Sequence, residues 1–280
     1  MVAFPWRKYS KTELLQEYNR LIQKIKAEKE SLLIPYKRVG LLCSNFFFQF
    51  ERLKTASLGN LSCYEYWKNP KNRDKIISFN KSLNRNTEYV QNITFFNHAP
   101  SQFSVFLAGM IYKYFDSKKV FDPYAGWGDR CLAAMALNID YTGIDCNKNL
   151  YSPFEKMIKT YPTKSDITIY INKSENTNIS KINFDLVLTS PPFWKNGKLL
   201  EEYCNTEEDY NTFLDSFIFV IKECLKKPAW VCLYIPKDMY KDVVKYIGRC
   251  KKIIKFITPR YINGSKKPYN KDNCIYCFRN

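Results

Sequence analysis

Apolar residues recur along this chain with two different spacings. From residue 119 onward, short apolar runs alternate with longer segments in which apolar residues return every three or four positions. The short runs predict buried β-strands at 119–121, 141–145, 167–172, 184–189, 229–236, 251–258 and 273–279. The longer segments predict helices between these strands. Strands that alternate with helices predict an α/β layer fold with a mostly parallel sheet.

The first third of the chain has a different pattern. Residues 11–30 place Leu14, Tyr18 and Leu21 at helical spacing with charged residues on the other face, which predicts an amphipathic helix. The stretch that follows mixes aromatic clusters, basic residues and turn signals, as helices joined by loops would. We therefore expect a small, mainly helical N-terminal subdomain at residues 1–91 and an α/β domain at residues 92–280.

The net charge of the chain predicts a polyanionic partner. The chain of 280 residues carries 44 Lys and Arg against 27 Asp and Glu, a net charge of +17. An excess of this size in a folded protein favours nucleic acid, although a merely solubilising surface is the alternative. Residues 64–75 interleave aromatic and basic side chains, which fits either base stacking with phosphate contacts or an aromatic core with solvated charges. Residues 241–280 are also strongly basic and are expected to follow phosphates.

The cysteines, the single histidine and the short apolar runs argue against several other classes of protein and of site. The ten cysteines are scattered singly, often within apolar runs, as expected in a reducing, intracellular compartment. No run is long enough to span a bilayer and the first residues contain no apolar signal segment, so we expect no membrane partner. His98 is the only histidine, which argues against His-rich metal sites and a Ser-His-Asp centre. Cys274 and Cys277 are spaced to lie on opposite faces of a strand, so no zinc site is expected.

A glycine-bearing loop follows the strand at 119–121. Its sequence is D-P-Y-A-G-W-G-D, and Gly126 and Gly128 let the backbone turn tightly and approach a ligand. A helix follows at once. The next strand ends in Asp145, about twenty residues after the glycines, where a carboxylate meets ribose hydroxyls in nucleoside-binding crevices. The combination of strand, glycine loop, helix, strand and acid indicates a nucleoside-binding site.

A second motif ends the strand at 184–189. Ser190 is followed by two prolines and Phe193. Successive prolines cannot extend a hydrogen-bonded ladder, so the chain must leave the sheet in a stiff conformation with uncommitted carbonyl oxygens. Such a loop beside an aromatic ring suits a flat ligand that carries an amino group.

Together, the glycine loop and the S-P-P-F tetrad resemble the class I S-adenosylmethionine-dependent methyltransferases, specifically the amino-methyltransferases of DNA whose cofactor motif comes first. The family signature is D-P-x-x-G-x-G followed by [D/N/S]-P-P-[F/Y/W], and the resemblance covers roughly residues 95–280. It implies a Rossmann-like sheet with an antiparallel last strand. Trp127 departs from the pattern, which has a small residue there. No large insertion follows the tetrad, so base recognition would fall to the N-terminal part and to the loops at 195–206 and 259–272.

The resemblance also implies roles for individual residues. Those implied to bind S-adenosyl-L-methionine are Phe103, Asp122, Pro123, Ala125, Gly126, Gly128 and Asp145. Those implied to act on the target amino group, with the base flipped out and stacked on the aromatic ring, are Ser190, Pro191, Pro192 and Phe193. Those expected to contact nucleic acid are Trp194, Lys195, Arg260, Lys266, Lys267 and Lys271.

Substrate expectations are less narrow. Serine at the first tetrad position is, in this family, seen more often with N4 of cytosine than with N6 of adenine, so methylation of cytosine N4 is expected ahead of adenine N6. The resemblance to amino-methyltransferases of DNA places DNA ahead of RNA. RNA is the alternative, because enzymes that act on adenine or guanine in RNA share the tetrad. A non-catalytic, nucleic-acid-binding subunit is the alternative from another class, and the two intact loops count against it.

Overall fold

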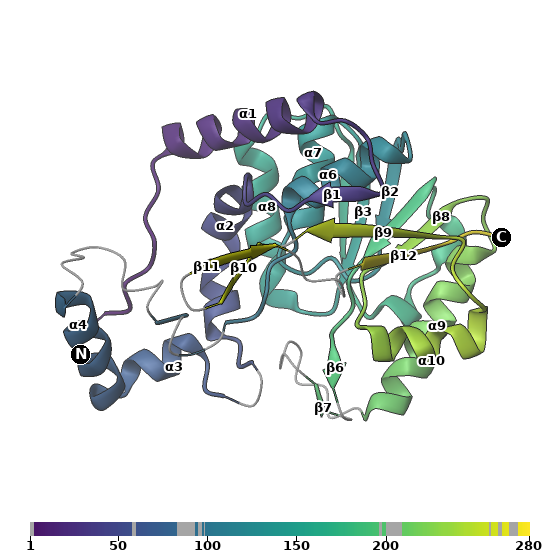
Figure 1. Cartoon of the computed structure of the whole chain (residues 1–280). Coiled ribbons are helices and arrows are strands. Elements are labelled where there is room, and N and C mark those ends of the chain that lie inside the picture. The colour runs from purple at the N-terminus through teal and green to yellow at the C-terminus, as the bar shows by residue number, and fades with distance from the viewer. Residues whose placement is uncertain are drawn as a thin grey trace.

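An eight-stranded sheet forms the centre of the protein (Figure 1). The computed structural model describes residues 3–57, 60–82, 93–94, 97, 99–195, 198–199, 209–257, 259–262, 265–268 and 274–280. The strands of this sheet are β1 (Leu33–Pro35), β2 (Lys119–Asp122), β3 (Asp140–Asp145), β4 (Ile167–Ile171), β5 (Leu186–Thr189), β8 (Trp230–Leu233), β9 (Lys252–Ile257) and β12 (Cys274–Phe278). Their order is β1-β9-β12-β8-β5-β2-β3-β4.

Strand direction confirms the predicted fold class. β12 is antiparallel to β8 and β9, whereas the other pairings of this sheet are parallel. The sheet is Rossmann-like, mostly parallel with an antiparallel last strand. The chain builds β2, β3 and β4 in one direction and then places β5 on the other side of β2. A sheet of this kind opens a crevice at the carboxyl ends of the two strands where the order reverses, here β2 and β5.

Helices cover both faces of the sheet. The helices of one face are α1 (Lys11–Ala27), α2 (Leu41–Lys54), α6 (Val105–Tyr114), α7 (Asp129–Leu137) and α8 (Tyr151–Thr160), and those of the other are α9 (Tyr210–Leu225) and α10 (Lys237–Ile247). In β5, Leu186 and Leu188 belong to the first core and Val187 to the second, because successive strand residues point to opposite faces. Short 3₁₀ helices lie at Lys148–Leu150, Ser174–Asn176 and Ile179–Lys181.

The N-terminal region consists of two parts. α1, β1 and α2 share the core of the sheet, and β1 pairs with β9 in parallel, a strand that the sequence pattern did not predict. α3 (Cys63–Lys68) and α4 (Pro70–Ser82) instead surround a separate small cluster and lie away from the sheet in Figure 1. The boundary expected between residues 91 and 92 lies outside the described residues and stays a prediction.

Two hairpins occupy segments that were expected to be loops. β6 (Trp194–Lys195) pairs with β7 (Lys198–Leu199) just after the tetrad, and β10 (Pro259–Ile262) pairs with β11 (Ser265–Pro268) within the expected loop at 259–272. Among the described residues, six cysteines are buried, as small hydrophobic residues would be: Cys43, Cys63, Cys131, Cys224, Cys232 and Cys277. His98 lies outside the described residues. None of the helices described is both long and apolar enough to cross a membrane.

Candidate active site

The loop between β2 and α7 turns at two glycines. Gly126 has a φ of +61° and Gly128 a φ of +74°, values that favour glycine. A Cβ at Gly128 would lie 2.5 Å from the ring of Phe48, so a second constraint excludes a side chain there. The N–H of Gly126 donates a hydrogen bond of 2.8 Å to Oδ2 of Asp145. The glycine loop is thereby attached to the end of β3.

Asp122, the last residue of β2, forms the centre of a buried polar network. Its carboxylate accepts hydrogen bonds from Nε of Arg130 at 2.6 Å and from the hydroxyls of Tyr141 and Thr189, each at 2.7 Å. The side chain is fully buried and does not line the cavity described below. Asp122 was expected to line the cofactor site. The structure places its carboxylate in this network, and a contact with the cofactor stays a prediction. A buried carboxylate needs such donors. Through the Thr189 hydroxyl, Asp122 connects the start of the glycine loop to the end of β5.

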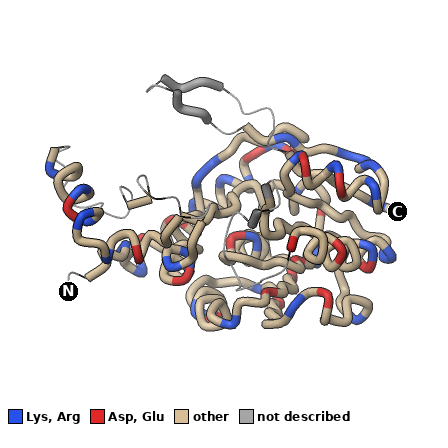
Figure 2. The backbone as a smooth tube through the Cα atoms, turned by 90° about the horizontal axis from the view of Figure 1, so that it is seen from below, with Lys and Arg blue, Asp and Glu red and all other residues tan. Residues whose placement is uncertain are grey.

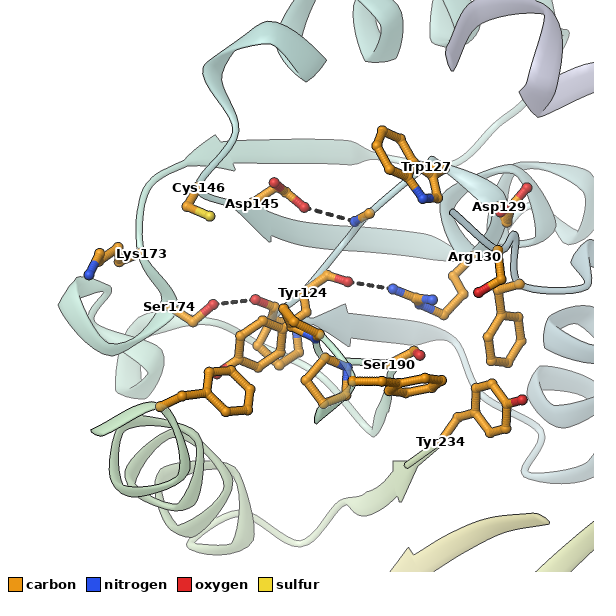
Figure 3. Close-up of a pocket in the computed structure, with 18 of the residues that line it drawn as sticks. Tyr124, Trp127, Asp129, Arg130, Asp145, Cys146, Lys173, Ser174, Ser190 and Tyr234 are labelled. Atoms are coloured by element: carbon orange, nitrogen blue, oxygen red, sulfur yellow. Dashed lines mark hydrogen bonds between the residues drawn. The ribbon is translucent and has the colours of Figure 1, made fainter. Parts of the chain in front are cut away.

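Arg130 extends from this network into the cavity wall. Its side chain is 5% exposed, and its guanidinium carbon lies 5.2 Å from the ring centroid of Phe103. It also donates a hydrogen bond to the carbonyl of Tyr124 (Figure 3). Burial alone would lower the pKa of Arg130, but the carboxylate of Asp122 outweighs this and raises that pKa above its ordinary value. Arg130 therefore supplies a permanent positive charge.

The tetrad begins where β5 ends. Ser190, Pro191, Pro192 and Phe193 all line the cavity. The ring of Phe193 packs edge-on against Tyr234, with the ring centroids 5.4 Å apart. Burial raises the pKa of Tyr234 to about 12, so its phenol stays neutral at physiological pH. This part of the cavity is uncharged and aromatic.

One cavity of about 200 Å³ lies between these two loops (Figure 3). The predicted residues that line it are Phe103, Pro123, Gly126, Asp145, Ser190, Pro191, Pro192, Phe193 and Trp194. Ala125 and Gly128 belong to the same turn but do not line the cavity. The structure thus brings together predicted residues from β2, β3, β5 and the segment before α6.

The residues expected to contact nucleic acid lie in several places. Trp194 is turned toward α9, where its ring stacks on Phe213 at 5.8 Å with an angle of 27° between the planes. Lys195 belongs to β6. On the β10–β11 hairpin, Arg260 pairs with Lys267 and Tyr261 with Lys266. Lys271 lies outside the described residues. Their contacts with nucleic acid stay predictions.

Several lining residues were missed by sequence reasoning. The segment after β4 contributes Asn172, Lys173, Ser174 and Glu175. The Ser174 hydroxyl donates to the carbonyl of Pro123, which joins this segment to the glycine loop (Figure 3). All carboxyl ends of the parallel strands face the same edge of the sheet, so the end of the predicted strand at 167–172 was a usable signal. Other missed lining residues are Ser101, Gln102, Tyr124, Trp127, Asp129, Arg130, Cys146, Phe213, Ser216 and Tyr234.

Asp129, the first residue of α7, is a buried acid in the cavity wall. The Ser44 hydroxyl and the Gln102 side-chain amide both donate hydrogen bonds to its Oδ1. Burial nevertheless raises the pKa of Asp129 from 3.8 to about 7, because the surroundings disfavour the ionised form more than these donors favour it. This carboxyl therefore changes charge near neutral pH.

Comparisons with known proteins find likeness in structure alone. No model of a known protein family matches the chain, and no curated protein matches its sequence. Among solved structures, an S-adenosylmethionine-dependent O-methyltransferase from Thermotoga maritima is 11% identical, with 64% of this chain and 67% of that chain covered and a TM-score of 0.44. An rRNA methylase from Streptococcus thermophilus is also 11% identical, with 64% and 96% covered and a TM-score of 0.39.

Proposed function

We propose that this protein transfers a methyl group from S-adenosyl-L-methionine to an exocyclic amino group of a base in DNA. The cytosine N4 amino group is the preferred target, ahead of adenine N6. One observation carries the proposal. The glycine loop and the S-P-P-F tetrad, 60 or more residues apart in sequence, line one cavity at the reversal point of the sheet, where ligands bind in folds of this kind.

The residues present in the cavity fit the cofactor. Asp145 lines the cavity beside the backbone of Gly126, where its carboxylate can accept hydrogen bonds from ribose hydroxyls. Phe103 and Trp127 supply apolar wall, and the positive charge of Arg130 suits the carboxylate of the methionine portion. When bound, the cofactor supplies an electrophilic methyl group on a sulfonium. The cavity residues hold and orient it.

The tetrad suits the target amine. The nitrogen lone pair of an exocyclic amino group is delocalised into the ring, so the nitrogen is a weak nucleophile. The Ser190 hydroxyl oxygen and the Pro191 carbonyl accept the two N–H groups, which favours a pyramidal nitrogen with a localised lone pair. Phe193, held edge-on by Tyr234, offers a ring face on which the flipped base stacks. Positioning of this kind supplies much of the rate in group transfer.

Nucleoside mass analysis tests the proposal. The protein is incubated with S-adenosyl-L-methionine and, separately, duplex DNA, single-stranded DNA and RNA, after which each polymer is digested. We expect N4-methylcytosine, or N6-methyladenine, in a DNA sample, and far less of it with Ser190→Ala after the same incubation time. Methylated nucleoside in the RNA sample alone would replace DNA by RNA in the proposal.

A matched control separates catalysis from folding. Ser216→Ala removes another cavity hydroxyl, on α9, and is expected to keep most of the activity. No product in any sample, with cofactor binding intact by calorimetry, would favour a non-catalytic role. Absence of cofactor binding would contradict the proposal as a whole.

A further inference from the structure

The small N-terminal cluster has buried and outward-facing aromatic residues. Phe4, Trp67 and Ile76 are buried and form its core. Trp6 and Tyr64 are only half-buried, and Phe50, at the end of α2, is 42% exposed. We call Trp6, Phe50 and Tyr64 the aromatic patch. The sequence left open whether the aromatic residues here serve packing or binding, and the structure divides them into two sets.

Within the aromatic patch the rings contact one another. Trp6 lies parallel to Tyr64, with 15° between the planes and 6.0 Å between the centroids, and its centroid is 4.6 Å from that of Phe50. In α2, Phe47 and Phe48 are buried in the core beneath the sheet, whereas the ring of Phe50 remains exposed. Contiguous exposed apolar surface is a mark of an interaction site.

The surroundings of the aromatic patch are basic. Residues 60–82, which contain α3 and α4, hold five Lys and Arg against two Asp and Glu, and Figure 2 shows the basic positions along these helices near the N-terminus. Nζ of Lys68 lies 4.4 Å from the ring centroid of Tyr64. One of the two acids, Glu65, is engaged with Ser62 in a capping box. Exposed rings among cations suit a partner with flat bases and phosphates.

The aromatic patch is connected to the cavity. Nη1 of Arg52 donates a hydrogen bond of 2.9 Å to the carbonyl of Pro100, and the next two residues, Ser101 and Gln102, line the cavity. α2 also carries both Ser44, which bonds to Asp129 in the cavity wall, and Phe50. Phe50 follows Ser44 by six positions, which is about 9 Å along a helix. The aromatic patch therefore shares a helix with a residue that supports the cavity wall.

We propose that the aromatic patch binds unpaired bases of the nucleic acid whose target base enters the cavity. Bases stack on Trp6 and Phe50, and phosphates contact Lys68 and the lysines of α4. This inference rests on the proposed function and adds the substrate form: a single-stranded or locally opened region next to the target. Stacking of this kind tolerates any base sequence, because every base has an aromatic face.

Fluorescence anisotropy of a labelled 15-nucleotide single strand tests the inference, with the same sequence as a duplex for comparison. We expect Trp6→Ala and Phe50→Leu each to weaken single-strand binding at least about fivefold, with a smaller effect on the duplex. Phe50→Leu keeps an apolar side chain and so preserves folding, and Phe50→Tyr, which keeps the ring, should bind as the wild type does. Phe219→Ala, which removes a ring that is 50% exposed on α9, is the matched control and should change nothing.

Lys68→Gln and Lys71→Gln test the cationic part. We expect them to reduce the slope of log affinity against log salt, whereas Phe50→Leu should leave that slope unchanged. The inference would be overturned if Phe50→Leu unfolds normally and binds the single strand as tightly as the wild type does. Normal cofactor binding and methylation in that variant would leave the proposed function standing. If the wild-type protein binds the strand but not the cofactor, the proposed function is contradicted and the aromatic patch remains a nucleic-acid site. Equal weakening of single strand and duplex would also overturn the preference for unpaired bases.

Discussion

The hydroxyl of Thr189 donates a hydrogen bond of 2.7 Å to the carboxylate of Asp122. Asp122 begins the glycine loop, and Thr189 immediately precedes the S-P-P-F tetrad. Both side chains are fully buried. This contact between adjacent parallel strands therefore adds a side-chain link between the start of the proposed cofactor loop and the start of the proposed amine-binding loop.

Thr189→Val tests this contact. The substitution keeps the shape of the side chain but removes the donor, so the buried carboxylate of Asp122 loses one of its partners. We expect a loss of about 1–2 kcal/mol in the free energy of unfolding. We also expect methyl transfer in single turnover to fall more than cofactor affinity. Thr189→Ser, which retains the hydroxyl, should restore both. A Thr189→Val variant as stable and as active as the wild type would contradict this role of the hydrogen bond.

Asp129 predicts how stability depends on pH. Its pKa is raised from 3.8 to about 7 in the folded protein, so between these values the folded state binds more protons than the unfolded state. Stability therefore falls as pH rises from about 4 to 7 and levels off above. Asp129→Asn removes this loss. In urea unfolding, the variant should be more stable than the wild type at pH 8 but not at pH 4. The same difference in unfolding free energy at both pH values would contradict the raised pKa.

The two glycines of the loop should differ in their response to alanine. Gly126→Ala meets only backbone strain, because the nearest atom to the new Cβ is 3.7 Å away, and we expect a cost of about 1–2 kcal/mol. Gly128→Ala adds a clash with Phe48 at 2.5 Å and should cost distinctly more. The measurement is chemical denaturation of both variants. Phe48→Leu in the Gly128→Ala background should recover part of the difference, and additive effects would show that the ring is not the obstacle.

Cofactor binding and methyl transfer should separate by residue. Asp145→Ala is expected to weaken cofactor affinity about tenfold or more, because hydrogen bonds to a charged group are lost. Ser190→Ala should instead lower the single-turnover rate about 100-fold while affinity changes little. Calorimetry and rapid-quench assays give the two quantities. Equal losses of affinity in both variants would contradict the division of roles between the glycine loop and the tetrad.

How far the sequence predicts the site depends on the range of the contacts involved. Local signals predicted the strand ends that bear Gly126, Asp145 and Ser190, because glycine, proline and apolar runs act on their immediate neighbours. The role of Asp122 was not predictable in this way, since its partners lie on three other elements. The same holds for β1, a three-residue strand that pairs only because β9 lies beside it. The aromatic residues near the N-terminus needed burial values before packing and binding could be separated.

Pairing between β1 and β9 has a consequence for how the protein folds. Leu33 lies beside Lys255 in this ladder, so an edge of the sheet unites segments from opposite ends of the chain. Such distant pairings carry a large loop-closure entropy and form late. During synthesis, β1 cannot join the sheet until β9 has been made, so this edge is completed only after nearly the whole chain has been synthesised.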